Sequence, residues 1–228
     1  MKVSAIIAAA GYGKRLGQPK QFLELLGKPI VSYSLRVFDA CELIDEIILV
    51  INQEDLGKAE RLVAELGISK PVKFAIGGEE RQDSVHHGLN RISEDTEIVV
   101  IHDGCRPLVT KSLIVELVSE AKASGAAIPG VPAKDTIKEV DEKNLVSSTL
   151  DRSILFNIQT PQAFKKDLIK EAYEHAQRIG YKATDDARLV ERLGQPVKVV
   201  TGSYENIKIT TPDDLVAAEA HLKARKES

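Results

Sequence analysis

Hydrophobic residues in the first 130 positions form short unbroken runs that alternate with stretches of helical periodicity. The runs predict strands at residues 3–10, 46–52, 72–76, 97–102 and 126–131. Helices are predicted at residues 31–40, 54–66, 83–92 and 111–124. Strands that are apolar on both faces are typical of parallel sheets covered by helices. The alternation predicts an α/β fold, a Rossmann-like three-layer sandwich whose mostly parallel central sheet carries helices on both faces.

The helical period disappears between residues 132 and 164. Residues 136–140 and 145–150 flank a tip of turn-forming residues, 141–144, which predicts a β-hairpin. An isolated two-stranded hairpin is only marginally stable in water. We therefore expect residues 133–158 to form a protruding β-arm that packs against a second copy of the chain in a symmetric homodimer.

The last third of the chain returns to alternating elements. Helices are predicted at residues 166–179 and 184–193, and strands at 196–200 and 206–210. Thr211 and Pro212 followed by two acidic residues are a strong start signal for a final helix. At 228 residues the chain is long enough for one large, well-buried domain, and we expect residues 1–228 to form it.

Composition excludes several classes of protein. The net charge of -3 argues against general nucleic-acid binding, which needs a basic surface. No apolar run approaches the ~18 residues that cross a bilayer, so no membrane span is predicted. Two cysteines, Cys41 and Cys105, are too few for a disulfide framework and lack metal-ligand spacing. These features fit a cytoplasmic protein.

The first predicted strand leads into a cationic, glycine-broken loop. Between Met1 and Leu23 there is no acidic residue, whereas Lys14, Arg15 and Lys20 follow Gly11 and Gly13. Glycines permit close backbone approach and the cations favour an anion, so the loop predicts a phosphate site at the carboxyl end of a strand. A glycine turn with solvated lysines is the plain alternative. The loop matches neither the G-x-G-x-x-G pattern nor the P-loop pattern.

The glycine loop and six later segments together carry a family resemblance. The loop reads AAGYGKR at residues 9–15 and PKQ at 19–21, which is similar to nucleotidyltransferases that join a nucleoside monophosphate to a phosphorylated polyol or sugar. The later segments are GGEERQDSV (77–85), HDGCRP (102–107), DTIK (135–138), QTPQ (159–162), TDDA (184–187) and NIKIT (206–210). Together they resemble the 2-C-methyl-D-erythritol 4-phosphate cytidylyltransferase family of the non-mevalonate isoprenoid pathway, over residues 3–222.

The resemblance implies a reaction and its catalytic residues. The phosphate of methylerythritol phosphate would attack the α-phosphorus of CTP, releasing pyrophosphate. Arg15 and Lys20 match residues that stabilise the transition state, while Arg152 and Lys208 match residues that hold the attacking phosphate. Mg²⁺ or another divalent cation is expected because it neutralises polyphosphate charge. Thr136 and Arg152 would come from the arm of the neighbouring subunit, so the sites would be shared.

The resemblance also implies two sets of binding residues. For CTP they are Ala9, Ala10, Gly11, Gly13, Gly77, Gly78, Glu79, Ser84 and Asp103. For the polyol phosphate they are Asp103, Arg106, Thr136, Arg152, Thr160, Thr184 and Lys208. Asp103 follows a predicted buried strand, where a carboxylate is costly unless it is paired or bound to a cation. It is therefore also a candidate metal ligand, whereas Arg106 has the alternative of bracing its own loop.

Other readings compete with this one. Ribitol 5-phosphate cytidylyltransferases share the CTP loop, and only residues 150–156 favour the methylerythritol enzyme. A dinucleotide-dependent dehydrogenase is disfavoured by the missing third glycine, and a non-catalytic nucleotide-binding module would not need both cationic pairs. Arg152 alone is equally compatible with a surface salt bridge. Three features have plain structural explanations: Cys105 as filler, adjacent His86 and His87 facing different directions, and Asp185–Asp186 as helix-terminal acids behind a Thr184 cap.

Overall fold

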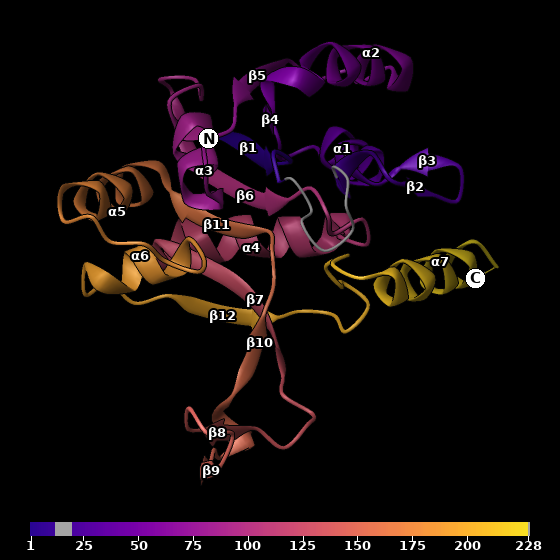
Figure 1. The fold of residues 1–228 in the computed structure, drawn as a ribbon. Coiled ribbons are helices and arrows are strands. Elements are labelled where there is room, and N and C mark those ends of the chain that lie inside the picture. The colour runs from indigo at the N-terminus through magenta and orange to yellow at the C-terminus, as the bar shows by residue number, and fades with distance from the viewer. Residues whose placement is uncertain (12–19, 228) are drawn as a thin grey trace.

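An eight-stranded sheet forms the centre of the chain, whose computed structural model describes residues 1–11 and 20–227 (Figure 1). The parallel strands are β1 (Lys2–Ala8), β4 (Glu46–Ile51), β5 (Val72–Ile76), β6 (Thr96–Asp103), β7 (Ala126–Pro132) and β12 (Lys198–Thr201). Two strands run the other way: β10 (Phe156–Ile158) and β11 (Gln162–Lys165). Both pair with β7 along the edge opposite β12, and β11 joins β7 to β6. The sheet is thus mostly parallel, as predicted.

Helices cover both faces of this sheet. On one face lie α1 (Ile30–Ala40), α2 (Leu56–Leu66) and α4 (Lys111–Ser124); on the other lie α3 (Arg81–Leu89), α5 (Lys166–Arg178) and α6 (Ala187–Arg192). Side chains of β1 alternate between the layers, Val3, Ala5 and Ile7 joining the first core and Ile6 the second. The predicted three-layer sandwich is confirmed. In the described part of the chain, no helix combines the length and apolar character needed to cross a membrane.

The C-terminal helix closes one end of the molecule. It is α7 (Pro212–Glu227), and the Asp214 amide donates to the Thr211 hydroxyl at 3.3 Å, as the start signal predicted. Its Ala218 joins a small separate core with Leu25. Short elements nearby are β2 (Glu24–Leu25), β3 (Lys28–Pro29) and the 3-10 turn η1 (Lys20–Phe22); a second 3-10 turn, η2 (Gln53–Asp55), precedes α2.

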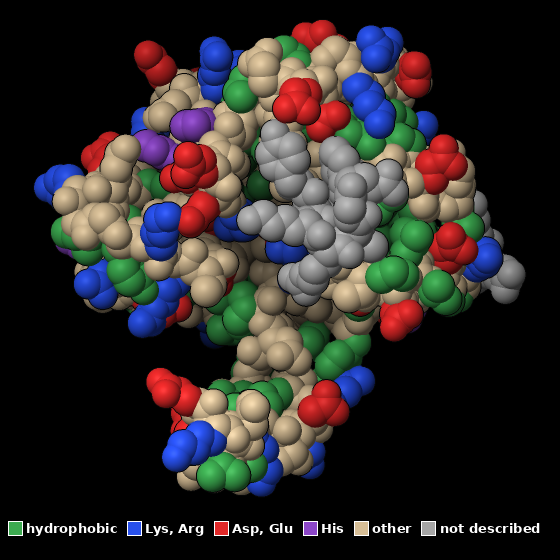
Figure 2. Space-filling model, in the orientation of Figure 1, with side chains coloured by type: hydrophobic (Ala, Val, Ile, Leu, Met, Phe, Trp, Pro, Cys, Tyr) green, Lys and Arg blue, Asp and Glu red, His purple; other side chains and the backbone are tan. Residues whose placement is uncertain are grey.

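The predicted hairpin is present and stands away from the body. Its strands are β8 (Lys138–Val140) and β9 (Val146–Thr149), followed by the 3-10 turn η3 (Arg152–Ile154). Figures 1 and 2 show it projecting beyond the sheet on a narrow neck. Several of its large apolar side chains are more than half exposed: Val140, Leu145, Val146 and Ile154. Exposed apolar patches of this kind mark surfaces that bind other proteins.

Two predictions in the second half were wrong or incomplete. Residues 206–210 form no regular strand; instead the Ile209 amide donates to the Cys105 carbonyl at 2.9 Å and the Asn206 side chain to the Thr160 carbonyl at 2.9 Å. The segment is held by individual contacts to neighbouring loops, so its apolar alternation reflects half-burial rather than sheet pairing. The antiparallel strands β10 and β11 were not predicted, because each has only three or four residues.

A buried acid at the amino end of β4 fastens three strands to the α3–β6 loop. Glu46 accepts hydrogen bonds from the Ser4 hydroxyl at 2.6 Å and from the Ser93 amide at 2.7 Å, and pairs with Lys73 at 2.7 Å. Burial alone would raise the pKa of Glu46, but hydrogen bonds from Lys73, Ser4 and Ser93 outweigh it and lower the pKa to about 2.

We expect Glu46→Gln to destabilise the protein by about 1.5 to 3 kcal/mol, the range for hydrogen bonds to charged groups. The folded-state pKa lies below the ordinary value of 4.5, so the stabilisation is present above pH 4.5 and is lost as the pH falls toward 2. Urea unfolding at pH 7 and pH 3 measures this. A difference between wild type and variant that stays constant or grows on acidification would contradict the assignment.

Candidate active site

Three loops meet at the carboxyl ends of β1, β5 and β6. The Gly77 amide donates to the Ile51 carbonyl at 2.9 Å, and the Gly104 amide to the Ala8 carbonyl at 2.9 Å. A Cβ atom added to Gly77 would lie only 2.2 Å from the Ala10 Cβ, so the β1 and β5 ends touch directly. The described parts of these loops therefore converge, and glycine at position 77 is required for this close approach.

The predicted CTP-binding residues are placed unequally. Ala9, Ala10, Gly11, Gly77 and Gly78 surround this meeting point. The buried Ser84 hydroxyl accepts a hydrogen bond from the Gly78 amide at 3.1 Å, whereas Glu79 is exposed. The predictions for Gly13 and Arg15 lie outside the described residues. Lys20 is described by its backbone alone, at the start of η1.

Asp103, the last residue of β6, is the centre of the charged cluster beside these loops. It is 6% exposed, and its two carboxylate oxygens are taken by different cations. Arg81 Nε lies 2.7 Å from Oδ1 and Lys208 Nζ lies 2.7 Å from Oδ2. Burial alone would raise the pKa of Asp103, but the charges of Arg81 and Lys208 hold it well below its usual range. The expectation that this carboxylate is paired is correct.

A neutral histidine supports Asp103 from beneath. The Asp103 amide donates to Thr160 Oγ1 at 3.0 Å, so the Thr160 hydroxyl hydrogen is left to donate to His102 Nδ1 at 3.2 Å. His102 Nε2 then carries the hydrogen and donates to the Arg106 carbonyl at 3.1 Å. Burial lowers the pKa of His102 to about 3, so the ring is uncharged at neutral pH. Thr160 thus contacts the site through the main chain of β6.

Residues 206–209 carry Lys208 to the cluster. Arg106 Nη1 donates to the Asn206 carbonyl at 2.7 Å, and the Asn206 amide group donates to the Thr160 carbonyl at 2.9 Å. Arg106 Nε lies 4.0 Å from Asp103 Oδ2 and is buried without a hydrogen bond. The Arg106 side chain therefore braces residues 206–209, where the sequence suggested its own loop as the alternative, and it also borders the site.

A pocket of about 450 Å³ opens beside Asp103. Five of the site residues predicted from the sequence line it, namely Asp103, Arg106, Thr160, Thr184 and Lys208. Arg81 and Arg188 add two further cations to its wall. Cationic side chains thus outnumber the three carboxylates in the lining, which favours an anionic ligand.

Thr136 and Arg152 do not reach this pocket within one chain. Both are exposed on the arm, and Arg152 Nη1 donates to the Lys134 carbonyl at 2.8 Å. Neither residue is among those that line the pocket of its own chain.

The interpretation of Asp186 as a helix-terminal acid was incomplete. Asp186 is the N-cap residue of α6, which begins at Ala187, but its side chain makes no cap hydrogen bond, whereas Asp185 accepts from the Arg188 amide at 3.1 Å. Asp186 is buried and pairs with Arg81, whose Nη2 lies 2.7 Å from its Oδ2. Arg81 itself was missed. Its signal was present, since an arginine directly after the GGEE turn begins a helix at the carboxyl edge of the sheet.

The described residues build no metal cage of their own. No group of three or more histidine, cysteine or acidic side chains stands together in residues 1–11 and 20–227. Asp103 offers one carboxylate, both of whose oxygens already contact cations. Mg²⁺ prefers several water and phosphate oxygens to a protein cage, so an ion that arrives with a polyphosphate would not require one.

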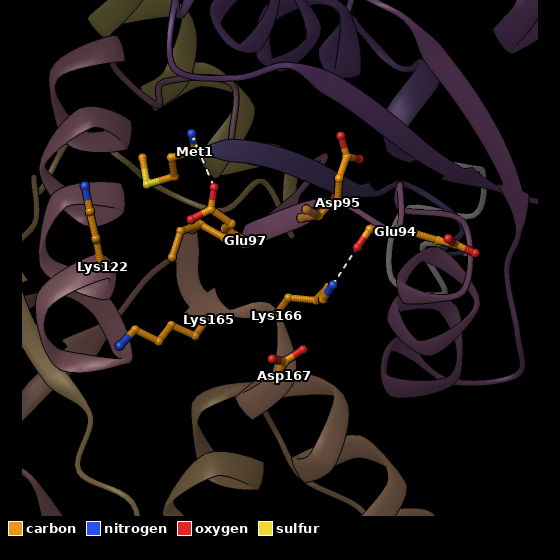
Figure 3. Close-up of a pocket in the computed structure, with 10 residues that line it drawn as sticks. Met1, Glu94, Asp95, Glu97, Lys122, Lys165, Lys166 and Asp167 are labelled. Atoms are coloured by element: carbon orange, nitrogen blue, oxygen red, sulfur yellow. Dashed lines mark hydrogen bonds and ion pairs between the residues drawn. The ribbon is translucent and has the colours of Figure 1, made fainter.

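A second hollow lies at the opposite, amino-terminal edge of the sheet (Figure 3). Met1, Glu97, Lys122 and Lys165 line it, and the pair between the Met1 amino group and Glu97 is 3.3 Å long. The Glu97 side chain is 60% exposed, so water screens this pair. The Asp103 pocket differs, because its carboxylate is buried and paired with cations.

Comparison with known proteins finds relatives over nearly the whole chain. Residues 3–224 match the family model described as 2-C-methyl-D-erythritol 4-phosphate cytidylyltransferase. A protein of that name from Geobacillus thermodenitrificans is 52% identical, and the match covers 99% of each chain. A second, from Alkaliphilus oremlandii, is 48% identical, and the match covers 99% of this chain and 97% of the relative. The crystal structure of 4-diphosphocytidyl-2C-methyl-D-erythritol synthase from Anaerococcus prevotii superposes with a TM-score of 0.88 at 35% identity, covering 97% of this chain and 98% of that one. The chain belongs to the 2-C-methyl-D-erythritol 4-phosphate cytidylyltransferase family.

Proposed function

We propose that this enzyme transfers CMP from CTP to 2-C-methyl-D-erythritol 4-phosphate, forming CDP-methylerythritol and releasing pyrophosphate in isoprenoid biosynthesis. The family supplies the reaction. The structural observation that supports it most directly is the pocket in which Arg81, Arg106 and Lys208 surround one buried carboxylate, beside the glycine contact of β1 and β5. The pocket suits a phosphorylated polyol, and the neighbouring loops suit the nucleotide.

The transfer is an in-line displacement at phosphorus. An oxygen of the methylerythritol phosphate forms a bond to the α-phosphorus of CTP, and the bond from that phosphorus to the bridging oxygen of the β-phosphate breaks. The second pKa of a phosphate monoester is about 6, so the nucleophile is already an anion at neutral pH and needs no general base. Positioning and neutralisation of charge therefore supply the catalysis. Lys208 holds the attacking phosphate, and Arg15 and Lys20 neutralise the triphosphate.

Recognition of the nucleotide is assigned to the β1 and β5 loops. The main chain of Ala9, Ala10, Gly11, Gly13, Gly77 and Gly78, with Ser84 and Glu79, receives CTP. A Cβ at Gly77 would lie 2.2 Å from the Ala10 Cβ, so only glycine fits at this position, where the backbone is free to approach the nucleotide. On the other side of Asp103, Arg106, Thr160, Thr184 and Lys208 receive the polyol phosphate.

Mg²⁺ is proposed to enter with CTP, bound mainly by triphosphate oxygens and water. When bound, it supplies charge neutralisation at the polyphosphate. Asp103, at the end of β6, is a carboxylate that could join its shell, at the cost of its contact with Arg81 or Lys208. Both cysteines are free thiols, which fits the cytoplasm as the compartment of the reaction.

A homodimer with exchanged arms is proposed to complete each site. Arg152 and Thr136 lie on the arm, away from their own pocket, while exposed apolar side chains on the same arm, such as Leu145 and Ile154, provide an adhesive surface. A two-fold axis would carry each arm to the partner's pocket, where Arg152 adds a second cation to the attacking phosphate.

Pyrophosphate release tests the reaction. CTP, ATP, UTP and GTP are each combined with methylerythritol phosphate and with ribitol 5-phosphate, and kcat/KM is measured. We expect CTP with methylerythritol phosphate to exceed every other pair by at least about 10²-fold. EDTA should abolish the reaction and excess Mg²⁺ restore it. A preference for ribitol 5-phosphate would show that the enzyme is a ribitol 5-phosphate cytidylyltransferase. If no pair releases pyrophosphate, the proposed enzymatic activity is refuted.

Gly77→Ala tests the nucleotide loops. The new methyl group must displace Ala10, and we expect kcat/KM for CTP to fall about 10- to 100-fold, the usual effect of a displacement near 1 Å. Gly57→Ala is the matched control, because its Cβ would approach nothing closer than Arg61 Nη1 at 3.7 Å in helix α2. Unchanged CTP kinetics in a folded Gly77→Ala protein would remove these loops from the site.

Mixing two inactive variants tests the shared site. Arg152→Ala and Lys20→Ala dimers are exchanged at equal concentration and assayed. If the partner's arm completes each site, half of the sites in mixed dimers are intact and about a quarter of wild-type activity returns. Sites built from one chain would remain inactive in every dimer, so failure of recovery despite demonstrated subunit exchange would contradict arm sharing.

A further inference from the structure

Arg81 is the only described residue that joins the Asp103 cluster to the helices behind it through charge. Its Nε donates to Asp103 Oδ1 at 2.7 Å, while Nη1 and Nη2 donate to the two oxygens of Asp186 at 3.1 and 2.7 Å. The guanidinium fork is therefore fully directed by two carboxylates from different parts of the chain. A bidentate contact of this kind fixes the plane of the guanidinium group as well as its position.

Asp186 is held in turn from the opposite side. The Tyr173 hydroxyl, on helix α5, donates to Asp186 Oδ1 at 2.5 Å. Asp186 is 1% exposed and Tyr173 is 2% exposed, so water does not compete for these bonds. Burial and the charge of Asp186 raise the pKa of Tyr173 well above its usual value, which keeps the hydroxyl a donor at every physiological pH.

The series of contacts from Tyr173 through Asp186, Arg81 and Asp103 ends at the Lys208 ammonium group. Arg81 occupies Asp103 Oδ1, which turns Oδ2 toward Lys208 at 2.7 Å. The Lys208 side chain is 40% exposed and has four rotatable bonds, so little else fixes its ammonium group. Lys208 donates directly to a group whose orientation depends on Arg81.

We propose that Arg81 is a positioning residue for CMP transfer: braced by Asp186 and Tyr173, it orients the Asp103 carboxylate and thereby places the Lys208 ammonium group for the attacking phosphate. The inference rests on the proposed function. It assigns a role in the reaction to Arg81, Asp186 and Tyr173, three residues that the transfer chemistry itself does not require. A purely structural clamp between α3, α6 and the sheet is the competing explanation.

A double-mutant cycle separates the two explanations. Arg81→Lys keeps the charge but loses the fork, and Lys208→Met removes the group on which Arg81 is proposed to act. We expect Arg81→Lys alone to lower kcat about 10- to 100-fold. In the Lys208→Met background the same change should cost less than about threefold, because its target is gone. A clamp would give multiplicative losses in both backgrounds.

A control and a milder variant keep the test decisive. Glu46→Gln also weakens a buried ion pair but lies at the amino end of the sheet, so it should lower the melting temperature and leave kcat and KM unchanged. If Arg81→Lys does not fold, Tyr173→Phe removes only the far hydrogen bond and is taken through the same cycle with Lys208→Met. We expect a loss of about 3- to 10-fold with Tyr173→Phe, again only when Lys208 is present.

The outcomes distinguish this inference from the proposed function. An inactive wild-type enzyme refutes the proposed function. An active wild type with an unaffected Arg81→Lys variant, or with losses that multiply fully in the Lys208→Met background, overturns the positioning role and leaves the reaction standing.

Discussion

The site depends on the cost of burying one carboxylate. Asp103 ends a strand whose residues are buried from Thr96 onward except Glu97, and an unpaired charge there would be strongly unfavourable. Arg81 and Lys208 compensate it from segments that are far apart in the sequence. Meeting this one requirement draws together the first turn of α3, the end of β6 and the segment before α7. The pocket is what remains between them.

Polar contacts beneath the cluster turn this electrostatic requirement into a defined shape. The Thr160 hydroxyl accepts a hydrogen bond from the Asp103 amide and donates one to neutral His102, while the Asn206 side chain donates to the Thr160 carbonyl. Each donor in this set is directed by the acceptor that it meets, so the loops after β6 and β10 cannot shift independently. The cations around the pocket are consequently held on a rigid frame rather than on free loops, which suits a reaction that relies on positioning.

The sequence predicted the layers of the fold well because long, doubly buried strands leave an unmistakable apolar run. β1, β4 and β6 were all recognisable in this way. β10 and β11 were not, since three or four residues flanked by polar segments carry no usable period. Residues 206–210 failed for a related reason: local alternation records burial, whereas strand pairing is decided by distant parts of the chain.

The site residues, too, were predicted where local sequence identifies them and missed where tertiary contacts decide. Asp103 and Lys208 were identified, and they meet at 2.7 Å, but the partners Arg81 and Asp186 were not. Asp186 lies two residues after Thr184 and directly before a helix, so local rules favoured a helix-terminal acid, and only the tertiary structure brings an arginine to it. Contacts that depend on one particular long-range pairing cannot be read from spacing. The family resemblance added roles for Arg15 and Arg152 that chemistry alone leaves open.

The pairing of Arg81 with Asp186 across 105 residues also bears on how the protein is made. A ribosome adds about 5 to 20 residues per second, so Asp186 emerges roughly 5 to 20 seconds after Arg81. By the time Asp186 emerges, every strand of the sheet except β12 has been synthesised, yet the acid at the end of β6 still lacks Lys208. The nascent chain at that point thus carries a nearly complete sheet with an unfinished charged edge. Lys208 follows all eight strands, so the charged edge is completed after most of the hydrophobic core has been synthesised.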